Sequence, residues 1–380
     1  MSYRVQAVVA ILFVVSVIVI AGQLRGEGRR LSSLAVFSLP PPAPFTVKYQ
    51  VASMTLREKI GQMFLVSFTG TELDEETASW MRTLEIGGVI LLGGNITSRE
   101  QTEKLIFALN DQVSKHAAAP LFISVDQEGG AVSRFKFTDF EMHSQKDIRS
   151  SALAYTVALQ RAKDLRSLGV NVNFSPVLDV SLSSDDFIYE RTFEGDADTV
   201  ATLGARMVQG YREGGIASAG KHFPGHGATG VNSHIDLPVT ERDSKAWSEH
   251  LHPFREAIQA EVPMIMMAHL KVPSIDPEFP ASLSKIIQED ILRNGLSYKG
   301  IIISDDLGMG ALTKNYTFPE IALRAVSAGT DILLVVRSQA VYEKMITAIE
   351  DAVAKKSISE ERIDESVIRI LSLKHELTSY

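Results

Sequence analysis

From Met54 onward the chain alternates short apolar runs with longer amphipathic stretches, a pattern typical of parallel βα units. The short runs are mostly apolar throughout, as expected of strands that are buried on both faces. The predicted strands are Met63–Phe68, Gly88–Leu92, Leu121–Val125, Val170–Phe174, Ile216–Ala219, Met264–Ala268, Gly300–Ser304 and Asp331–Val335. Helices are predicted over stretches such as Arg99–Lys115, Ala152–Leu168, Thr199–Glu213 and Ser244–Ala260, with Asp196 and Asp243 as N-caps. Eight such units favour an α/β fold with a single (β/α)8 TIM barrel over residues 51–380, closed by a helix over Glu360–Leu377.

An apolar segment and a proline-rich stretch precede the predicted barrel. Ala7–Gly22 is an unbroken apolar run, and Val19-Ile20-Ala21 near its end has small enough residues at the spacing suited to signal-peptide cleavage after Ala21. Arg4 precedes the run, whereas more arginines follow it, so a membrane anchor remains an alternative to a signal peptide. We expect residues 1–22 to direct export to a periplasmic, extracellular or membrane-anchored location. Residues 23–50, which include Pro40–Pro44, are predicted to be an extended linker.

Charge and composition exclude several classes of function. The formal net charge is −8, and no basic stripe is present, which argues against nucleic acid as a partner. The chain contains no cysteine, so disulfides, zinc–thiolate sites, thiol nucleophiles and a lipidated cysteine are excluded.

Polar side chains gather directly after the predicted strands, where the active sites of such barrels lie. The positions are Asp126–Gly130 after the third strand, Asp179 after the fourth, Lys221-His222 after the fifth, His269 after the sixth and Asp305-Asp306 after the seventh. Asp305 ends the most apolar run of the chain, and a carboxylate fixed at the end of such a strand suits a nucleophile. A helix-capping role for Asp305 or Asp306 is the alternative.

The stretch after the fifth strand carries groups that can transfer protons. Lys221, His222, His226 and His234 lie within fourteen residues that also contain several glycines. Histidine can donate and then recover a proton near neutral pH. Retaining glycoside hydrolysis needs such an acid/base together with a nucleophilic carboxylate. For any one of these histidines a structural hydrogen bond is the alternative.

Three motifs resemble those of glycoside hydrolase family 3, and more narrowly its bacterial β-N-acetylglucosaminidase branch of peptidoglycan turnover. The motifs are Val125–Gly130, Lys221–Gly227 with Asn232-Ser233-His234, and Ser304–Leu307. The resemblance covers residues from about Val51 to the C-terminus. It implies a carbohydrate partner, a β-linked N-acetylglucosamine glycan, and neither a metal ion nor a cofactor.

The resemblance also implies residue roles. Asp305 would be the nucleophile that forms a glycosyl-enzyme intermediate, and His234 would be the acid/base. The sugar would be bound by Asp126, Arg134, Arg191, Lys221 and His222. Asn232, Asp179 and His269 would contact and orient these residues without touching the sugar.

The sequence departs from the family pattern at two positions. The family has aspartate two residues before the loop histidine, where this chain has Asn232, and often arginine where it has Ala131. Asparagine can accept a ring N–H but adds no charge, so we expect a weakened acid/base step. Asp236 is a possible substitute for the missing carboxylate.

Four alternative functions remain at this point. A glycan-binding barrel without hydrolysis is suggested by Asn232 alone. A metal-dependent amidohydrolase would use His222, His226 and His269, but the usual His-x-His pair after the first strand is replaced by Ser67–Gly70. A β-glucosidase-type exo-glycosidase is the third alternative. Phosphorolysis is the fourth, because a neutral imidazole repels phosphate less than a carboxylate does.

Overall fold

A computed structural model describes residues 43–117, 119–227 and 229–378. Within these residues, eight strands form one parallel sheet. The strands are β1 (Phe64–Val66), β2 (Gly88–Leu91), β3 (Phe122–Val125), β4 (Val172–Asn173), β5 (Ala217–Phe223), β6 (Met264–Met267), β7 (Ile301–Ser304) and β8 (Leu333–Val335). Their order follows the chain, and β1 pairs with β8. A parallel bridge between Ile303 and Ile332 connects β7 to the residue before β8. The strands therefore close into the predicted barrel.

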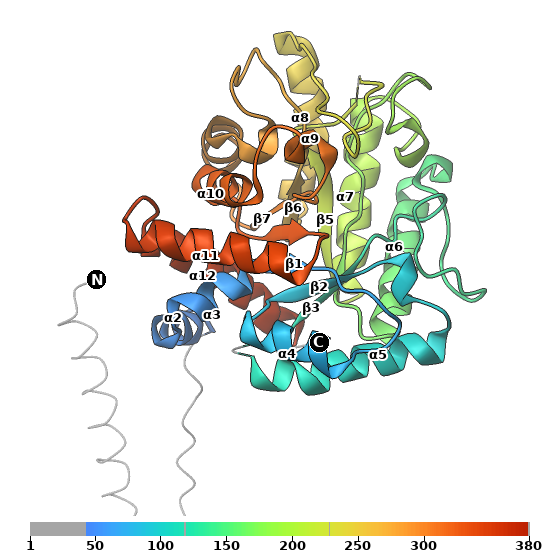
Figure 1. The fold of residues 1–380 in the computed structure, drawn as a ribbon. Helices are drawn as coiled ribbons and strands as arrows, with labels where there is room; N and C mark the ends of the chain where they lie inside the picture. Colours follow the sequence, from blue (N-terminus) through green and yellow to red (C-terminus); the bar gives the residue numbers. More distant parts are fainter. Residues whose placement is uncertain (1–42, 118, 228, 379–380) are drawn as a thin grey trace, which may run out of the picture. The chain divides into compact units, whose positions relative to one another are not determined.

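Helices surround the strands on the outside of the barrel (Figure 1). They are α2 (Ala43–Ser53), α3 (Leu56–Gln62), α4 (Glu75–Thr83), α5 (Arg99–Gln112), α6 (Ser151–Ser167), α7 (Ala197–Glu213), α8 (Ser244–Gln259), the wider helix η7 (Ile286–Gly295), α9 (Gly310–Thr313), α10 (Phe318–Ala328), α11 (Gln339–Ala354) and α12 (Glu360–Leu377). The side chains of Asp196 and Asp243 accept amide hydrogen bonds at the starts of α7 and α8, as predicted. Such caps satisfy amides that have no acceptor within the helix.

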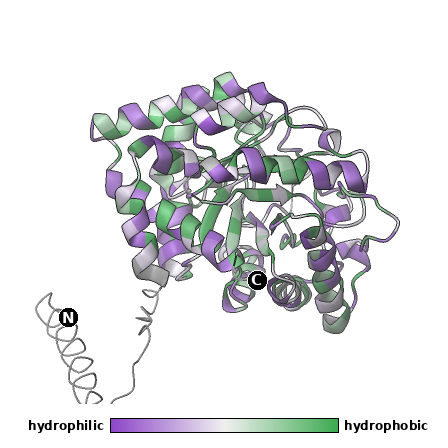
Figure 2. Cartoon of the chain, turned by 90° about the horizontal axis from the view of Figure 1, so that it is seen from below, coloured by the Kyte–Doolittle hydropathy of each residue, from purple (hydrophilic) through white to green (hydrophobic). Residues whose placement is uncertain are grey.

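The distribution of apolar residues explains the layering. All residues of the β7 run Ile301–Ile303 are at most 1% exposed, because side chains on one face fill the barrel and those on the other contact helices. Figure 2 shows hydrophobic strands in the interior and helices that carry hydrophilic residues outward.

The predicted linker extends too far toward the barrel. Residues 43–50 belong to α2, not to an extended linker, and α2 packs against α12. Val47 and Val51 lie one helical turn apart and are 1% and 2% exposed. A single apolar stripe on this helix therefore docks it on the barrel, and the proline-rich composition before it hid that stripe.

The strand boundaries also differ from those predicted. Most strands are shorter, but β5 continues to Phe223, so Lys221 and His222 lie within the strand and not after it. Polar residues fit in this strand because they face the barrel mouth. Residues 1–42, with the predicted signal peptide or anchor and the first part of the linker, lie outside the described residues. Across the described part of the chain, no helix combines the length and apolar character that a membrane crossing requires.

Candidate active site

A cavity of about 300 Å³ opens at the carboxyl ends of the strands. All seven residues predicted to catalyse the reaction or bind sugar line it: Asp126, Arg134, Arg191, Lys221, His222, His234 and Asp305. Asp126 follows β3, Asp305 follows β7, and Arg191 comes from the loop between β4 and α7. The barrel thus brings together groups that lie up to about 180 positions apart in the sequence.

Four charged side chains form a network on one wall of the cavity. The Lys221 ammonium contacts Asp126 Oδ1 at 2.8 Å and Glu128 Oε1 at 2.6 Å. The Arg191 guanidinium binds both oxygens of Glu128, at 2.9 and 2.7 Å. Arg134 lies at the edge of the network, 3.5 Å from Asp126 Oδ2.

The electrostatics of this network keep its members charged. Burial raises the pKa of the Glu128 carboxyl, but Arg191 and Lys221 outweigh burial and hold that pKa well below its ordinary range. Burial lowers the pKa of Lys221, and Asp126 and Glu128 reverse this effect, so the pKa is raised overall. The network therefore presents fixed cations to the cavity without leaving an unpaired buried charge.

Asp179 lies behind the cavity and orients His222. Its Oδ2 is 2.7 Å from His222 Nδ1, and its carboxylate also accepts the backbone amides of His222 and His226. Burial raises the pKa of Asp179, but His222 and the His226 amide dominate and lower it to about 2. Because an ionised carboxylate only accepts hydrogen bonds, Nδ1 of His222 carries the proton and Nε2 faces Arg191 at 3.5 Å.

Asp305 is held as an ionised carboxylate. Burial alone would raise its pKa, but the His222 and His269 rings, the Asp306 amide and Lys221 hold it below its ordinary value. The Asp306 amide donates to Asp305 Oδ1 at 2.8 Å. An ionised carboxylate at the mouth of the barrel is the form that a nucleophile needs.

His269 supports the backbone beside Asp305. Its Nε2 donates to the Asp306 carbonyl oxygen at 2.9 Å, and its Nδ1 accepts the Ser282 hydroxyl at 2.7 Å. Burial lowers the pKa of this ring, so it is neutral at neutral pH and suits this pair of hydrogen bonds. His269 therefore acts on the loop that carries the carboxylate.

His234 lines the cavity from the loop between β5 and α8. Its ring packs edge-on against Phe187, with centroids 6.4 Å apart, and makes no hydrogen bond among the described residues. Asn232 Oδ1 accepts the backbone amide of His234 at 2.9 Å and does not contact the ring. The structure therefore does not show the predicted hydrogen bond from the ring to Asn232.

Asp236 does not replace the missing carboxylate in this structure. Its Oδ2 lies 3.1 Å from the Lys314 ammonium on the protein surface. Among the described residues, the ring of His234 thus contacts neither an aspartate nor an asparagine side chain.

Two residues of the cavity wall, Glu128 and His226, are not among those predicted to catalyse the reaction or bind sugar. Glu128 is 2% exposed and forms ion pairs with both Arg191 and Lys221. It lies in the motif that follows the third strand. His226 is 3% exposed, and both its ring nitrogens lack a partner among the described residues. Burial lowers its pKa to about 4, so the ring is neutral. The sequence signal available for Glu128 is its place in the motif Val125–Gly130, directly after the third predicted strand.

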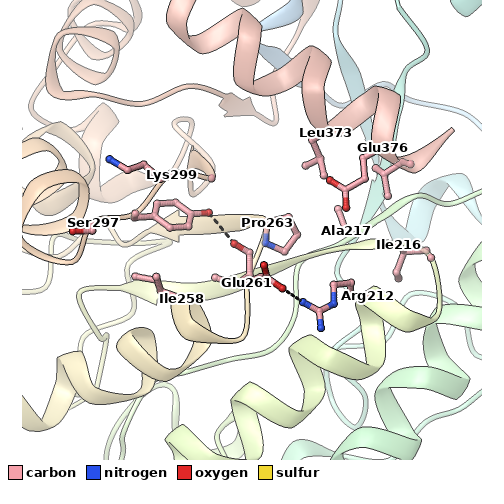
Figure 3. A pocket seen from close by; sticks show the side chains of 15 residues that line it. Arg212, Ile216, Ala217, Ile258, Glu261, Pro263, Ser297, Lys299, Leu373 and Glu376 are labelled. Atoms are coloured by element: carbon pink, nitrogen blue, oxygen red, sulfur yellow. Dashed lines mark hydrogen bonds and ion pairs between the residues drawn. The ribbon is translucent and has the colours of Figure 1, made fainter. Parts of the chain in front are cut away.

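A larger cavity of about 400 Å³ lies at the opposite, amino-terminal end of the strands (Figure 3). The Arg212–Glu261 ion pair borders it on one side, and Leu373 and Glu376 of α12 border it on the other. None of the predicted site residues lines this cavity, and barrel enzymes place their chemistry at the other end. Size therefore does not identify the functional site here.

The described residues contain no group of three histidine or carboxylate side chains arranged to hold a metal ion. Of the three histidines that the amidohydrolase alternative required, His222 is hydrogen-bonded through its ring to Asp179 and His269 to the Asp306 carbonyl oxygen. The ring of His226 has no hydrogen-bond partner among the described residues. The geometry thus gives that alternative no support.

Comparisons with known proteins agree with the geometry. Residues 55–373 match the glycosyl hydrolase family 3 N terminal domain. A beta-hexosaminidase A from Pseudoalteromonas piscicida is 32% identical over 335 residues, which cover 81% of this chain and 56% of that protein. A beta-hexosaminidase from Idiomarina loihiensis is 33% identical, with 80% of this chain and 92% of that protein covered.

A solved structure shows the same fold. A family 3 beta-N-acetylglucosaminidase from Paenibacillus sp. str. FPU-7 superimposes with a TM-score of 0.82 at 36% identity, covering 86% of this chain and 63% of that one. This chain therefore spans less than two thirds of the Pseudoalteromonas and Paenibacillus proteins. The family match nevertheless covers most of the length of this chain, and the chain belongs to glycosyl hydrolase family 3.

Proposed function

We propose that the chain is a retaining exo-β-N-acetylglucosaminidase that releases terminal N-acetylglucosamine from β-linked glycans. One observation carries the proposal: an ionised Asp305 and the loop histidine His234 share a cavity walled by fixed cations. The names of the family 3 relatives support the choice of sugar.

The reaction proceeds in two displacements. An Asp305 oxygen bonds to the anomeric carbon while the bond from that carbon to the leaving oxygen breaks, and His234 gives its proton to that oxygen. A water molecule then attacks the anomeric carbon, passes a proton to His234 and releases Asp305. Both displacements invert the anomeric carbon, so its configuration is retained.

The wall residues suit a single terminal sugar. Lys221 has a third N–H beyond its bonds to Asp126 and Glu128, and Arg134 is only loosely paired, so both can donate to sugar hydroxyls. Asp126 accepts hydrogen bonds, and His222 offers Nε2. The cavity is at the small end of the range for ligand pockets, which favours one sugar ring and exo action.

The first experiment compares wild type with Asp305→Ala on nitrophenyl β-N-acetylglucosaminide and nitrophenyl β-glucoside. We expect hydrolysis of the N-acetyl substrate by wild type and a loss of at least about 10⁴-fold in the variant. A 5-fluoro glycosyl fluoride should label Asp305, as located by mass spectrometry of peptides.

Other outcomes select the other functions. Faster hydrolysis of the glucoside would indicate a β-glucosidase. Sugar binding by calorimetry without turnover would indicate a glycan-binding barrel, which Asn232 favours because, among the described residues, the His234 ring has no hydrogen-bond partner. Production of the sugar 1-phosphate in phosphate buffer would indicate phosphorolysis.

We also propose export and action on peptidoglycan-derived glycans. The apolar run 7–22 and the small residues before Gly22 support export, as a cleaved or an anchored protein. The mass of the protein recovered from expressing cells distinguishes the two forms, because cleavage after Ala21 removes the first 21 residues. Recovery of the full-length chain from the soluble cytoplasm would contradict export.

A further inference from the structure

The loop that carries His234 is joined by its backbone to the segment that follows Asp305. The Gly310 amide donates to the His234 carbonyl oxygen at 3.1 Å, and the Ala311 amide donates to the Ser233 carbonyl oxygen at 3.2 Å. The Lys314–Asp236 ion pair connects the same two segments on the surface. Three links therefore join residues 233–236 to residues 310–314.

Each of these two segments is internally fixed. On the histidine side, the Asn232 carbonyl oxygen accepts the Ile235 and Asp236 amides, both at 3.0 Å, and its side chain accepts the His234 amide. Residues 232–236 therefore form a tight turn that these three internal hydrogen bonds stabilise.

On the carboxylate side, Asp306 Oδ1 accepts the amides of Gly308 and Val336, both at 2.8 Å. The Leu307 amide donates to the Leu334 carbonyl oxygen at 2.9 Å. Gly310 is therefore fixed relative to Asp305 through β8.

The junction requires a residue without a side chain at position 310. A Cβ on Gly310 would lie 2.6 Å from the Ile235 carbonyl oxygen and 2.8 Å from that of His234, both backbone atoms. These separations are shorter than van der Waals contact, and the turn would have to move away. The backbone of Gly310 does not have a positive φ, so alanine at this position tests the contact and not the backbone conformation.

We infer that Gly310 is a positioning residue: its missing Cβ lets the turn 232–236 dock beside the nucleophile, and the docking holds His234 over Asp305. This inference rests on the proposed function of those two residues. It explains how His234 is placed although its ring has no hydrogen-bond partner among the described residues. Backbone hydrogen bonds supply part of the placement that an aspartate at position 232 would otherwise give.

The test uses three variants of the full chain: Gly310→Ala, Ala311→Pro and the control Gly94→Ala. Proline removes the Ala311 amide hydrogen at the start of α9, where a helix tolerates proline. Gly94 lies in the loop after β2, and a Cβ there meets no atom within 4 Å. Circular dichroism and thermal unfolding verify that each variant folds.

Hydrogen–deuterium exchange measures directly whether the turn 232–236 is docked on residues 310–314. We expect the amides of residues 229–237 to exchange about tenfold faster in Gly310→Ala and Ala311→Pro, and at the wild-type rate in Gly94→Ala. Unchanged exchange in both junction variants overturns the docking, whether or not the protein hydrolyses sugars.

Kinetics read the effect on the acid/base step. In the junction variants kcat/KM for an alkyl β-N-acetylglucosaminide should fall about tenfold or more, with a smaller loss on the nitrophenyl sugar, whose leaving group needs little acid help. The pH profile should lose the limb that His234 contributes, and azide should restore release from the glycosyl-enzyme. Equal losses on both substrates with an unchanged pH profile overturn a positioning role. Unchanged sugar release in Asp305→Ala overturns the proposed function itself, while the exchange result still decides the docking.

Discussion

The carboxylate of Glu128 organises two of the cations in the cavity wall. It is almost completely buried between Arg191 and Lys221, and among the described residues no other carboxylate forms an ion pair with Arg191. Removing one partner from a buried ion network is costly because the remaining charges lose their compensation. Glu128 therefore stabilises the fold and sets the position of groups proposed to bind sugar.

Glu128→Gln should lower the free energy of unfolding by about 3 kcal/mol and reduce kcat/KM by roughly 10²-fold. The amide keeps the shape of the side chain but removes the charge that faces both cations. Urea unfolding and steady-state kinetics measure the two effects. The control Glu190→Gln breaks an exposed pair with Lys146 and should change stability by at most about 0.5 kcal/mol. Equal effects of the two substitutions would contradict the role given to Glu128.

Asn232→Asp should strengthen the acid/base step. One carboxylate oxygen can keep the bond to the His234 amide, and the added negative charge favours the protonated imidazole. We expect turnover of alkyl β-N-acetylglucosaminides to rise about tenfold or more relative to nitrophenyl sugars. The measurement is the ratio of kcat/KM for the two substrates in wild type and variant, and an unchanged ratio would discard the idea.

At the scale of elements, tertiary contacts explain the polar end of β5 and the stability of the short helix α2. The β5 strand carries Lys221 and His222 in its last residues, where the strand ends at the barrel mouth and polar groups meet Asp126 and Asp179. The α2 helix is short, and its stability comes from packing Val47 and Val51 against the barrel.

Val51→Ala should lower the free energy of unfolding by about 1–3 kcal/mol if α2 is part of the barrel domain. Tyr49→Ala, on the same helix, is the matched control, because Tyr49 is 75% exposed and its loss should be nearly neutral. Urea unfolding of the two variants decides the point. A neutral Val51→Ala would mean that the helix does not contribute to the fold.

At the scale of the whole molecule, buried titratable groups determine how the barrel responds to acid. Burial lowers the pKa values of His226 and His250 to about 4, from an ordinary 6.5, so the folded chain resists protonation that the unfolded chain accepts. The free energy of unfolding should therefore fall as pH decreases from about 6.5 to about 4. Asp179 has a lowered pKa, so its contribution is complete above its ordinary pKa of 3.8 and is lost as pH falls further toward about 2.

The pH dependence of urea unfolding tests this prediction. His250→Gln removes one buried imidazole whose pKa burial lowers, and His250 lies outside the cavity wall. Its unfolding free energy should depend less steeply on pH between about 6.5 and about 4, by up to one proton. The same slope in wild type and variant would show that His250 is not protonated on unfolding in that window.

The sequence by itself determined the barrel and the order of its parts. Strands that are buried on both faces are apolar throughout, and this local signal predicts each of the eight strands. The observed strand ends differ from the predicted ones by a few residues. The positions of Asp126, Asp305 and Lys221 at the carboxyl ends of strands followed from the same pattern, because a barrel gathers those ends in one place.

Only the tertiary structure decided which side chains meet. The pair Glu128–Arg191, the contact of Asn232 with an amide and not a ring, and the junction at Gly310 join segments that are distant in sequence or depend on loop conformation. Local periodicity carries no information on such pairs, since strand register and the packing of loops fix them. For the same reason the sequence predicts a linker where α2 lies, because only the burial of its valines shows that this segment belongs to the barrel domain.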